Sequence, residues 1–152
     1  MKAKEYLNQL ALLDMKINLK LKELDGLRTK LIGVGSINYS DDRVQTSPKS
    51  DAQFAEILHN IECLEKEIND DIDKLVNKKH EIISQIQELK QPKQIEILYK
   101  RYVEYKSLEV IAVEMNYTYP YVRKLHGYAL QEFEKRNKML HKRNTMLQSN
   151  VL

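Results

Sequence analysis

The chain has 152 residues, of which 42% are hydrophobic and 31% charged, with only 4 Gly and 3 Pro. This balance is typical of a folded, helix-rich protein and excludes a disordered or glycine-rich one. The longest stretch without a charged residue, residues 31–40, is about half the roughly 20 apolar residues that a membrane-spanning helix needs. The first residues lack a signal-peptide core, and the single cysteine, Cys63, allows no internal disulfide. We therefore expect a cytoplasmic protein without a membrane contact.

Charge and tyrosine are unevenly distributed. Residues 1–90 hold 14 Lys or Arg and 16 Asp or Glu, a net charge of −2, whereas residues 91–152 hold 11 and 6, a net charge of +5. Seven of the 9 tyrosines also lie in the second part. Pro92 follows a long helical pattern and cannot continue it without the loss of a backbone hydrogen bond, so it marks the predicted boundary between two modules.

The first module, residues 1–90, predicts two long helices. Over residues 3–31 an apolar residue recurs every seventh position, at Ala3, Leu10, Ile17, Leu24 and Leu31, with Tyr6, Leu13 and Leu27 between them. Gly33 and Gly35 interrupt this pattern, and the polar residues after them predict a loop at 33–50.

A second helical pattern follows the loop. Ser50 and Gln53 have the spacing of a capping box, which predicts that the helix begins near Ser50. Its apolar repeat consists of Phe54, Ile61, Ile68, Leu75, Ile82 and Leu89, with Ile57, Leu64, Ile72 and Ile86 as the companion stripe. Together the two helices predict an antiparallel hairpin, or coiled coil.

Further apolar residues widen the stripe of the first helix beyond what one partner helix covers; they are Leu12, Met15, Leu19 and Leu21. They indicate a homodimer or, alternatively, packing on the C-terminal module of the same chain.

The second module, residues 91–136, predicts three helices. The first covers residues 94–105, with Ile95, Leu98, Tyr99, Tyr102 and Val103 at the spacing of one buried face. Ser107 can cap a short helix over 108–115, and Asn116 is one of the few residues that accept the left-handed backbone of a tight turn. The third helix starts at Tyr119 or Pro120, capped by Thr118 or Tyr119. Its predicted inward face is Val122, Leu125, Ala129 and Phe133.

The last two helices have the spacing of a helix-turn-helix. Apolar residues stand at the positions where two crossing helices bury them: Ile111, Ala112, Met115, Tyr117, Val122 and Leu125. Ala112 has to be small because the following helix packs over it. A helical hairpin without a DNA role can show the same spacing.

The segments SLEVIAVEMNYT (107–118), VRKL (122–125) and AL (129–130) resemble region 4 of bacterial sigma factors. The whole chain is similar to phage late-transcription regulators of the ArpU and RinA type, because DRVQTSP (42–48) and NDDIDKL (69–75) also resemble the coiled-coil half of that group. This resemblance implies sequence-specific binding of double-stranded DNA and activation of transcription alongside host RNA polymerase, at the nucleoid of a bacterial cell. The chain has no promoter-melting region beside the hairpin, so we do not expect it to replace a sigma factor.

A recognition helix lies in the major groove, and its N-terminal residues contact base edges. The predicted DNA-binding residues are Thr118, Tyr119, Pro120, Tyr121, Arg123, Lys124 and Gly127. Arg123 can bind guanine through two hydrogen bonds, whereas Lys124 suits a phosphate. Tyr119 and Tyr121 can donate to phosphate or contact thymine methyl groups, and close approach to DNA or to another helix can explain Gly127.

For the other basic residues and for His126, the sequence allows two interpretations. Those of the basic C-terminal tail, residues 137–152, and of the end of the third helix either contact phosphates or are only solvated; they are Lys135, Arg136, Lys138, Lys142 and Arg143. His126 either contacts phosphate or is a surface residue without a role.

We expect neither a metal nor another cofactor. His59 and Cys63 share a helical face but have no second ligand pair at finger spacing, and residues 67–73 lack the glycine of a calcium loop. No nucleophile and base form a catalytic pair, so we expect no enzyme. The sequence thus favours a DNA-binding transcription regulator; the alternative is a phage-encoded interaction module whose hairpin inhibits a host complex or acts as its adaptor.

Overall fold

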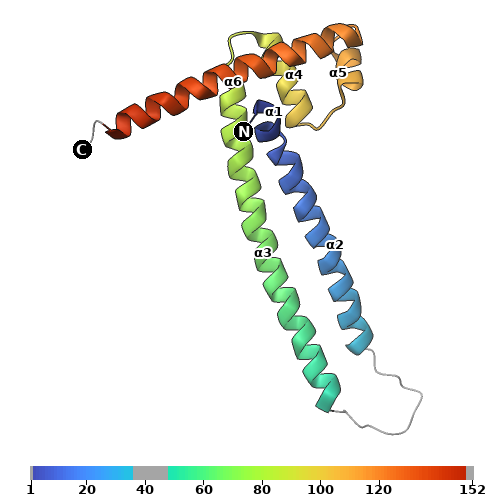
Figure 1. The fold of residues 1–152 in the computed structure, drawn as a ribbon. Coiled ribbons are helices and arrows are strands. Elements are labelled where there is room, and N and C mark those ends of the chain that lie inside the picture. Colours follow the sequence, from blue (N-terminus) through green and yellow to red (C-terminus); the bar gives the residue numbers. More distant parts are fainter. Residues whose placement is uncertain (1, 36–47, 150–152) are drawn as a thin grey trace. The chain divides into compact units, whose positions relative to one another are not determined.

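The computed structural model describes the backbone of residues 2–35 and 48–149 and the side chains of residues 2–35 and 51–139. Within them the helices are α1 (Ala3–Leu7), α2 (Gln9–Gly35), α3 (Pro48–Gln87), α4 (Pro92–Tyr102), α5 (Leu108–Glu114) and α6 (Tyr119–Ser149) (Figure 1). These residues contain no strand, which confirms the predicted all-α class. No helix of this part of the chain is long and apolar enough to cross a membrane.

The chain divides into two compact units. One consists of Met1–Leu12 with Val76–Leu152, and the other of Leu13–Leu75. The first unit therefore contains α1, α4, α5 and α6 together with the start of α2 and the end of α3. Most of the predicted loop at 33–50, including nearly all of the DRVQTSP segment, lies outside the described residues.

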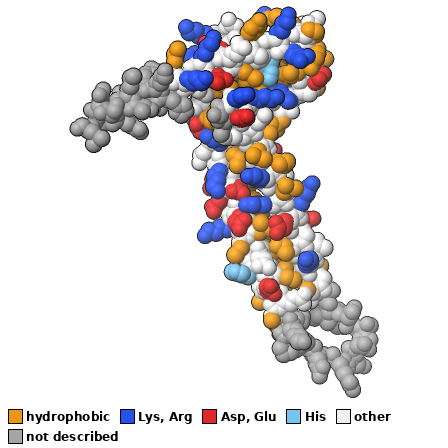
Figure 2. Space-filling view, viewed as in Figure 1, with side chains coloured by type: hydrophobic (Ala, Val, Ile, Leu, Met, Phe, Trp, Pro, Cys, Tyr) orange, Lys and Arg blue, Asp and Glu red, His pale blue; other side chains and the backbone are white. Residues whose placement is uncertain are grey.

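The unit Leu13–Leu75 consists of α2 and α3 segments packed side by side (Figure 1). Its core contains Leu24, Ile57, Ile61, Leu64 and Ile68, with Leu27, Leu31 and Val34 packed against them. Two ion pairs show that the helices run in opposite directions. Arg28 binds Glu65 at 2.6 Å, and Lys20 binds Asp71 at 2.7 Å, so later residues of α2 face earlier residues of α3. Charged side chains of both signs cover the visible face of this helix pair (Figure 2).

Not every residue of the two apolar repeats is buried. Phe54 and Ile72 are 39% and 38% exposed, although Ile61 and Ile68 of the same repeat as Phe54 are buried. The additional apolar residues of α2 are more exposed still: Met15 is 53%, Leu19 57% and Leu21 44% exposed. A single partner helix covers only one face of α2, and these residues lie outside it.

The helix ends differ from the prediction. The helix α3 begins near Ser50, but the predicted cap is wrong: the helix starts at Pro48, so Ser50 lies in its first turn. Proline is well suited to this first position because its missing N–H has no partner there in any case. The helix α2 continues to Gly35, the second of the two glycines that were expected to interrupt it, so the predicted loop bound at residue 33 is two residues early. The N-terminal repeat contains a break at Asn8, between α1 and α2.

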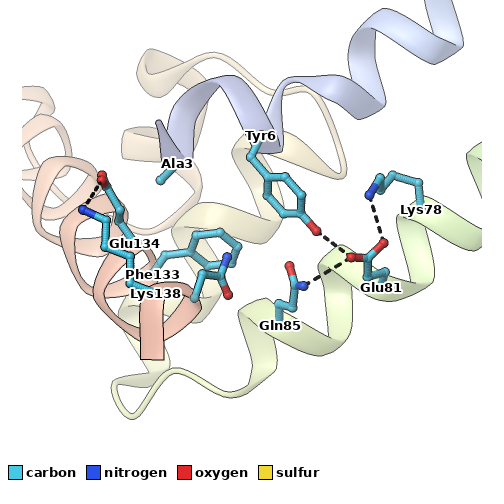
Figure 3. Close-up of a pocket in the computed structure, with 9 residues that line it drawn as sticks. Ala3, Tyr6, Lys78, Glu81, Gln85, Phe133, Glu134 and Lys138 are labelled. Carbon is cyan, nitrogen blue, oxygen red and sulfur yellow. Dashed lines mark hydrogen bonds and ion pairs between the residues drawn. The ribbon is translucent and has the colours of Figure 1, made fainter. Parts of the chain in front are cut away.

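In the larger unit, α4, α5 and α6 pack on one another and α1 packs on α6. The rings of Tyr6 and Phe133 lie 6.2 Å apart. The Tyr6 hydroxyl donates to the Glu81 carboxylate at 2.8 Å, and Lys78 binds the same carboxylate at 3.0 Å (Figure 3). Burial and the bond to Glu81 raise the pKa of Tyr6 to about 12. This contact connects α1 to the end of α3.

The buried face of α4 is shifted from the predicted one. Gln94, Ile97, Leu98, Tyr102 and Val103 are buried, whereas Tyr99 is 37% exposed and Ile95 only half-buried. Two adjacent apolar stripes run along this helix, and which of them is buried depends on where α6 crosses it. Sequence spacing alone does not contain that information.

His126 is half-buried and contacts Tyr102, so it is not a surface residue without a role. Its ring stacks on Tyr102 with centroids 5.8 Å apart, and its Nε2 lies 3.0 Å from the Tyr102 hydroxyl. Burial, and to a lesser degree the charges of Arg101 and Lys4, lower the pKa of His126 to about 4. His126 is therefore neutral at pH 7, and its Nε2 and the Tyr102 hydroxyl share a hydrogen bond.

We expect the stability of this unit to fall as the pH is lowered from about 6.5 to about 4. In that range His126 of the unfolded chain, with an ordinary pKa of 6.5, binds a proton that the folded chain excludes. Urea midpoints measured by circular dichroism at pH 7.5 and pH 5 should differ less in His126→Gln than in the parent chain. The matched control His80→Gln changes an exposed histidine and should leave the difference intact. An equal change of the urea midpoint with pH in His126→Gln and in the parent chain would contradict the proposed effect of His126 on stability.

Candidate nucleic-acid interface

A tight turn joins α5 to α6. Ser107 caps α5 as predicted, since its hydroxyl accepts a hydrogen bond from the Val110 N–H at 3.4 Å. At the other end Asn116 has φ 56°, the left-handed backbone that its type was expected to adopt. The Tyr117 N–H donates to the Ala112 carbonyl at 2.9 Å and thereby closes the end of α5. The turn thus has a fixed geometry.

The contact between α5 and α6 fixes which face of α6 is exposed. Ala112 is 5% exposed, and Ile111 of α5 and Val122 of α6 are fully buried beside it. The inward residues predicted for α6, Val122, Leu125, Ala129 and Phe133, are all buried. The first half of α6 therefore presents its opposite face to solvent.

The predicted DNA-binding residues lie at the start of α6. Because α6 begins at Tyr119 and the Val122 N–H donates to the Thr118 carbonyl at 3.1 Å, the residue before the helix is Thr118. Tyr119, Pro120, Arg123 and Lys124 line one shallow pocket on the exposed face. Thr118 is exposed beside them, and Gly127 is half-buried one turn further along.

Tyr121 lies apart from that pocket. It is 42% exposed, but its ring packs on Tyr117 with centroids 4.8 Å apart, on the side of α6 that faces the start of α4. Lys93, the second residue of α4, lies over the Tyr117 ring at 4.9 Å from its centroid. Hydrogen bonding to Tyr117 raises the pKa of Lys93 above its ordinary value. Sequence analysis did not include Lys93, because 24 residues separate it from Tyr117 and only the packing of α4 brings them together.

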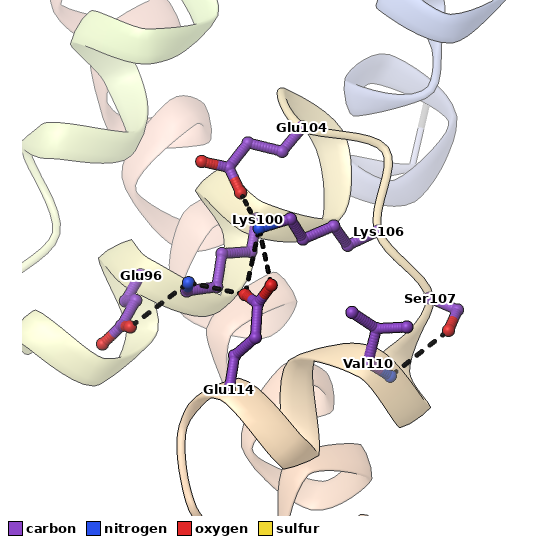
Figure 4. Close-up of polar contacts among 7 residues, drawn as sticks. All are labelled: Glu96, Lys100, Glu104, Lys106, Ser107, Val110 and Glu114. Carbon is purple, nitrogen blue, oxygen red and sulfur yellow. Dashed lines mark hydrogen bonds and ion pairs between the residues drawn. The ribbon is translucent and has the colours of Figure 1, made fainter.

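Positive charge near the turn is partly neutralised. Lys100 and Lys106 both bind the Glu114 carboxylate at 2.8 Å, and Lys106 also binds Glu104 (Figure 4). Their bonds to Glu114 lower the pKa of that carboxyl and contribute to raised pKa values of the two lysines. In contrast, Arg123 and Lys124 form no ion pair within the described part of the chain. Arg123 and Lys124 thus add positive charge to the exposed face of α6 that no ion pair within the described residues neutralises.

Two lysines further along α6 lie beside carboxylates. Lys135 lies 4.0 Å from Glu132, and Lys138 binds Glu134 at 3.0 Å. Most of the predicted tail is part of α6, which continues to Ser149. The side chains of Lys142 and Arg143 lie outside the described residues.

No group of metal-ligating side chains occurs in the described residues, and the exposed Cys63 contacts His59 alone, at 3.6 Å. Comparison of the chain with family models, curated proteins and solved structures gives no match. The geometry of α5, the turn and α6 is therefore the main structural evidence on function. Its exposed polar and positively charged side chains can donate hydrogen bonds to base edges and phosphates.

We expect Gly127→Ala to stabilise the isolated protein by about 1 kcal/mol, because alanine favours a helix more than glycine does. A Cβ atom at Gly127 meets nothing within 4 Å, so the protein itself does not require glycine there. Gly26→Ala in α2 is the matched control, since its Cβ atom also meets nothing. Urea denaturation should show a similar gain for both. A loss for Gly127→Ala alone would show that the protein itself uses this glycine.

Proposed function

We propose that this protein is a DNA-binding transcription regulator in which α5, the turn and α6 act as a helix-turn-helix. The single observation that carries the proposal is the pair of unpaired cations, Arg123 and Lys124, on the exposed face at the start of α6. An N-terminal segment of this kind is the part of a recognition helix that enters the major groove. The fixed turn at Asn116 supports this, because base contacts need a rigidly held helix.

The two cations have different proposed roles. Arg123 reads guanine O6 and N7 through two parallel hydrogen bonds, which only its planar group can supply. Lys124 binds a phosphate as a point charge. Thr118 and Tyr119 contact the backbone or thymine methyl groups, and Gly127 allows DNA to approach α6 closely.

The direction of regulation and the polymerase partner are proposals from the resemblance to the ArpU and RinA type. We propose that the protein binds near promoters of phage late genes and activates them together with host RNA polymerase in the bacterial cytoplasm. Footprinting of the DNA around its gene, with and without polymerase, tests this. Protection that appears only with polymerase supports activation, whereas protection that blocks polymerase contradicts it.

We also propose that the regulator is a homodimer. The exposed Met15, Leu19 and Leu21 on α2 support a protein contact in this part of the chain, because burying such side chains is favourable. The same residues favour the second candidate function, an adaptor or inhibitor that captures a host protein. Analytical ultracentrifugation of the protein alone distinguishes the homodimer from an adaptor or inhibitor that uses this surface for a host protein. A dimer that Leu19→Glu dissociates supports the first, and a monomer contradicts it.

Replacement of Arg123 and Lys124 should separate their roles. We expect Arg123→Ala to weaken binding to a duplex selected from a random pool by about 1 to 3 kcal/mol and to relax preference at one base pair. Lys124→Ala should instead weaken all sequences alike and reduce the slope of log affinity against log salt by about 0.9. Fluorescence anisotropy over a range of salt concentrations measures both effects.

Lys66→Ala, which removes an exposed lysine of α3, is the control and should change neither quantity. Equal losses for Arg123→Ala and Lys124→Ala on every duplex would contradict the assigned roles. Absence of any complex at low salt would contradict DNA binding itself.

A further inference from the structure

A shallow groove of about 430 Å³ runs between the start of α4 and the first half of α6. Gln91 and Gln94 contribute to it from α4, and Tyr121, Lys124 and Tyr128 from α6. Lys124 lines both this groove and the pocket that contains Arg123. The groove is therefore continuous with the face that we propose to contact DNA.

Gln94 is the unusual residue of this groove. It is 7% exposed and is the one polar side chain that is buried among the described residues. Its side-chain amide forms no hydrogen bond within that part of the chain, yet it is not among the fully shielded polar atoms. The amide therefore reaches solvent through the groove. Because the amide has no partner within the described residues and opens onto the groove, a ligand in the groove can replace the water that it binds there.

The surroundings of Gln94 favour an anion. Lys124 and the exposed hydroxyl-bearing Tyr128 lie along α6, and Lys93 is held close by through its contact with the Tyr117 ring. The N-terminus of α4 adds the positive end of a helix dipole. Glu132 is the one carboxylate of the groove, and it lies beside Lys135 at 4.0 Å.

We infer that this groove binds one backbone phosphate of the duplex that α6 reads, with the Gln94 amide and the Tyr128 hydroxyl donating to it and Lys124 supplying charge. The inference rests on the proposed function and adds a second element, α4, to the interface. A phosphate bound beside the base-reading face fixes the position of the recognition helix but carries no sequence information itself.

Replacement of Gln94 tests the inference, because a ligand role and a structural role predict opposite changes in stability. Gln94→Met keeps the volume but removes the donor. We expect its urea midpoint to be unchanged or raised, since the substitution breaks no hydrogen bond within the described part of the chain and adds an apolar side chain at a buried position. Its affinity for the selected duplex and for an unrelated one should fall alike, by about tenfold. Gln87→Met, at the exposed end of α3, is the matched control and should change neither.

Tyr128→Phe is a second variant, and we expect it to fold like the parent protein because Tyr128 is 61% exposed. It should also lower affinity without a change in base preference. A set of duplexes with one neutral methylphosphonate each then identifies the phosphate. At one position of the duplex, the methylphosphonate should weaken binding by the parent protein. At the same position it should not further weaken binding by Gln94→Met, which already lacks the donor.

Binding of the duplex with equal affinity by Gln94→Met and the parent would overturn the inference while leaving DNA binding intact. A lowered urea midpoint in Gln94→Met would overturn it too, since it would indicate a structural role. Inorganic phosphate is the probe for a free anion. If it shifts the amide resonances of Lys93 and Gln94 and the duplex does not, the site does not bind DNA. If no duplex binds the parent protein, the proposed function itself fails.

Discussion

The crossing of α5 and α6 at Ala112 is the contact on which the rest of the candidate site depends. A small side chain at this point lets the helices approach, and the left-handed Asn116 lies in the tight turn that joins them. Because Val122, Leu125 and Ala129 are buried where α6 packs on its neighbouring helices, Arg123 and Lys124 lie on the exposed face. Exposure of the two cations is thus a consequence of core packing.

Ion pairs neutralise part of the positive charge of this unit. Glu114 neutralises lysines from α4 and from the segment before α5, whereas the start of α6 contains no acidic residue. In the interior, His126 stays neutral at pH 7 because burial disfavours its charged form. The exposed face at the start of α6 therefore keeps its positive charge, which would attract a negatively charged partner.

The two proposed contacts have complementary tasks. Arg123 would discriminate between bases, while Gln94 and Lys124 would hold the backbone and set the depth and angle at which α6 enters the groove. Because α4 packs directly on α6 (Figure 1), a phosphate bound at the start of α4 would limit rotation of α6 on the duplex. Specific binding needs such a limit, since a base contact through two hydrogen bonds tolerates little misalignment.

The sequence by itself determined the features that depend on local spacing. Heptad repeats predicted the long helices, the types of Ser107 and Asn116 predicted the cap and the turn, and the apolar positions of α6 predicted its buried face. Only the tertiary structure decided features in which residues far apart in the chain meet. The Tyr102–His126 pair, the Lys93–Tyr117 contact and the burial of Gln94 all depend on how α4 lies against α6. Periodicity fixes which residues share a helical face, but the crossing of two helices selects which of those faces is covered.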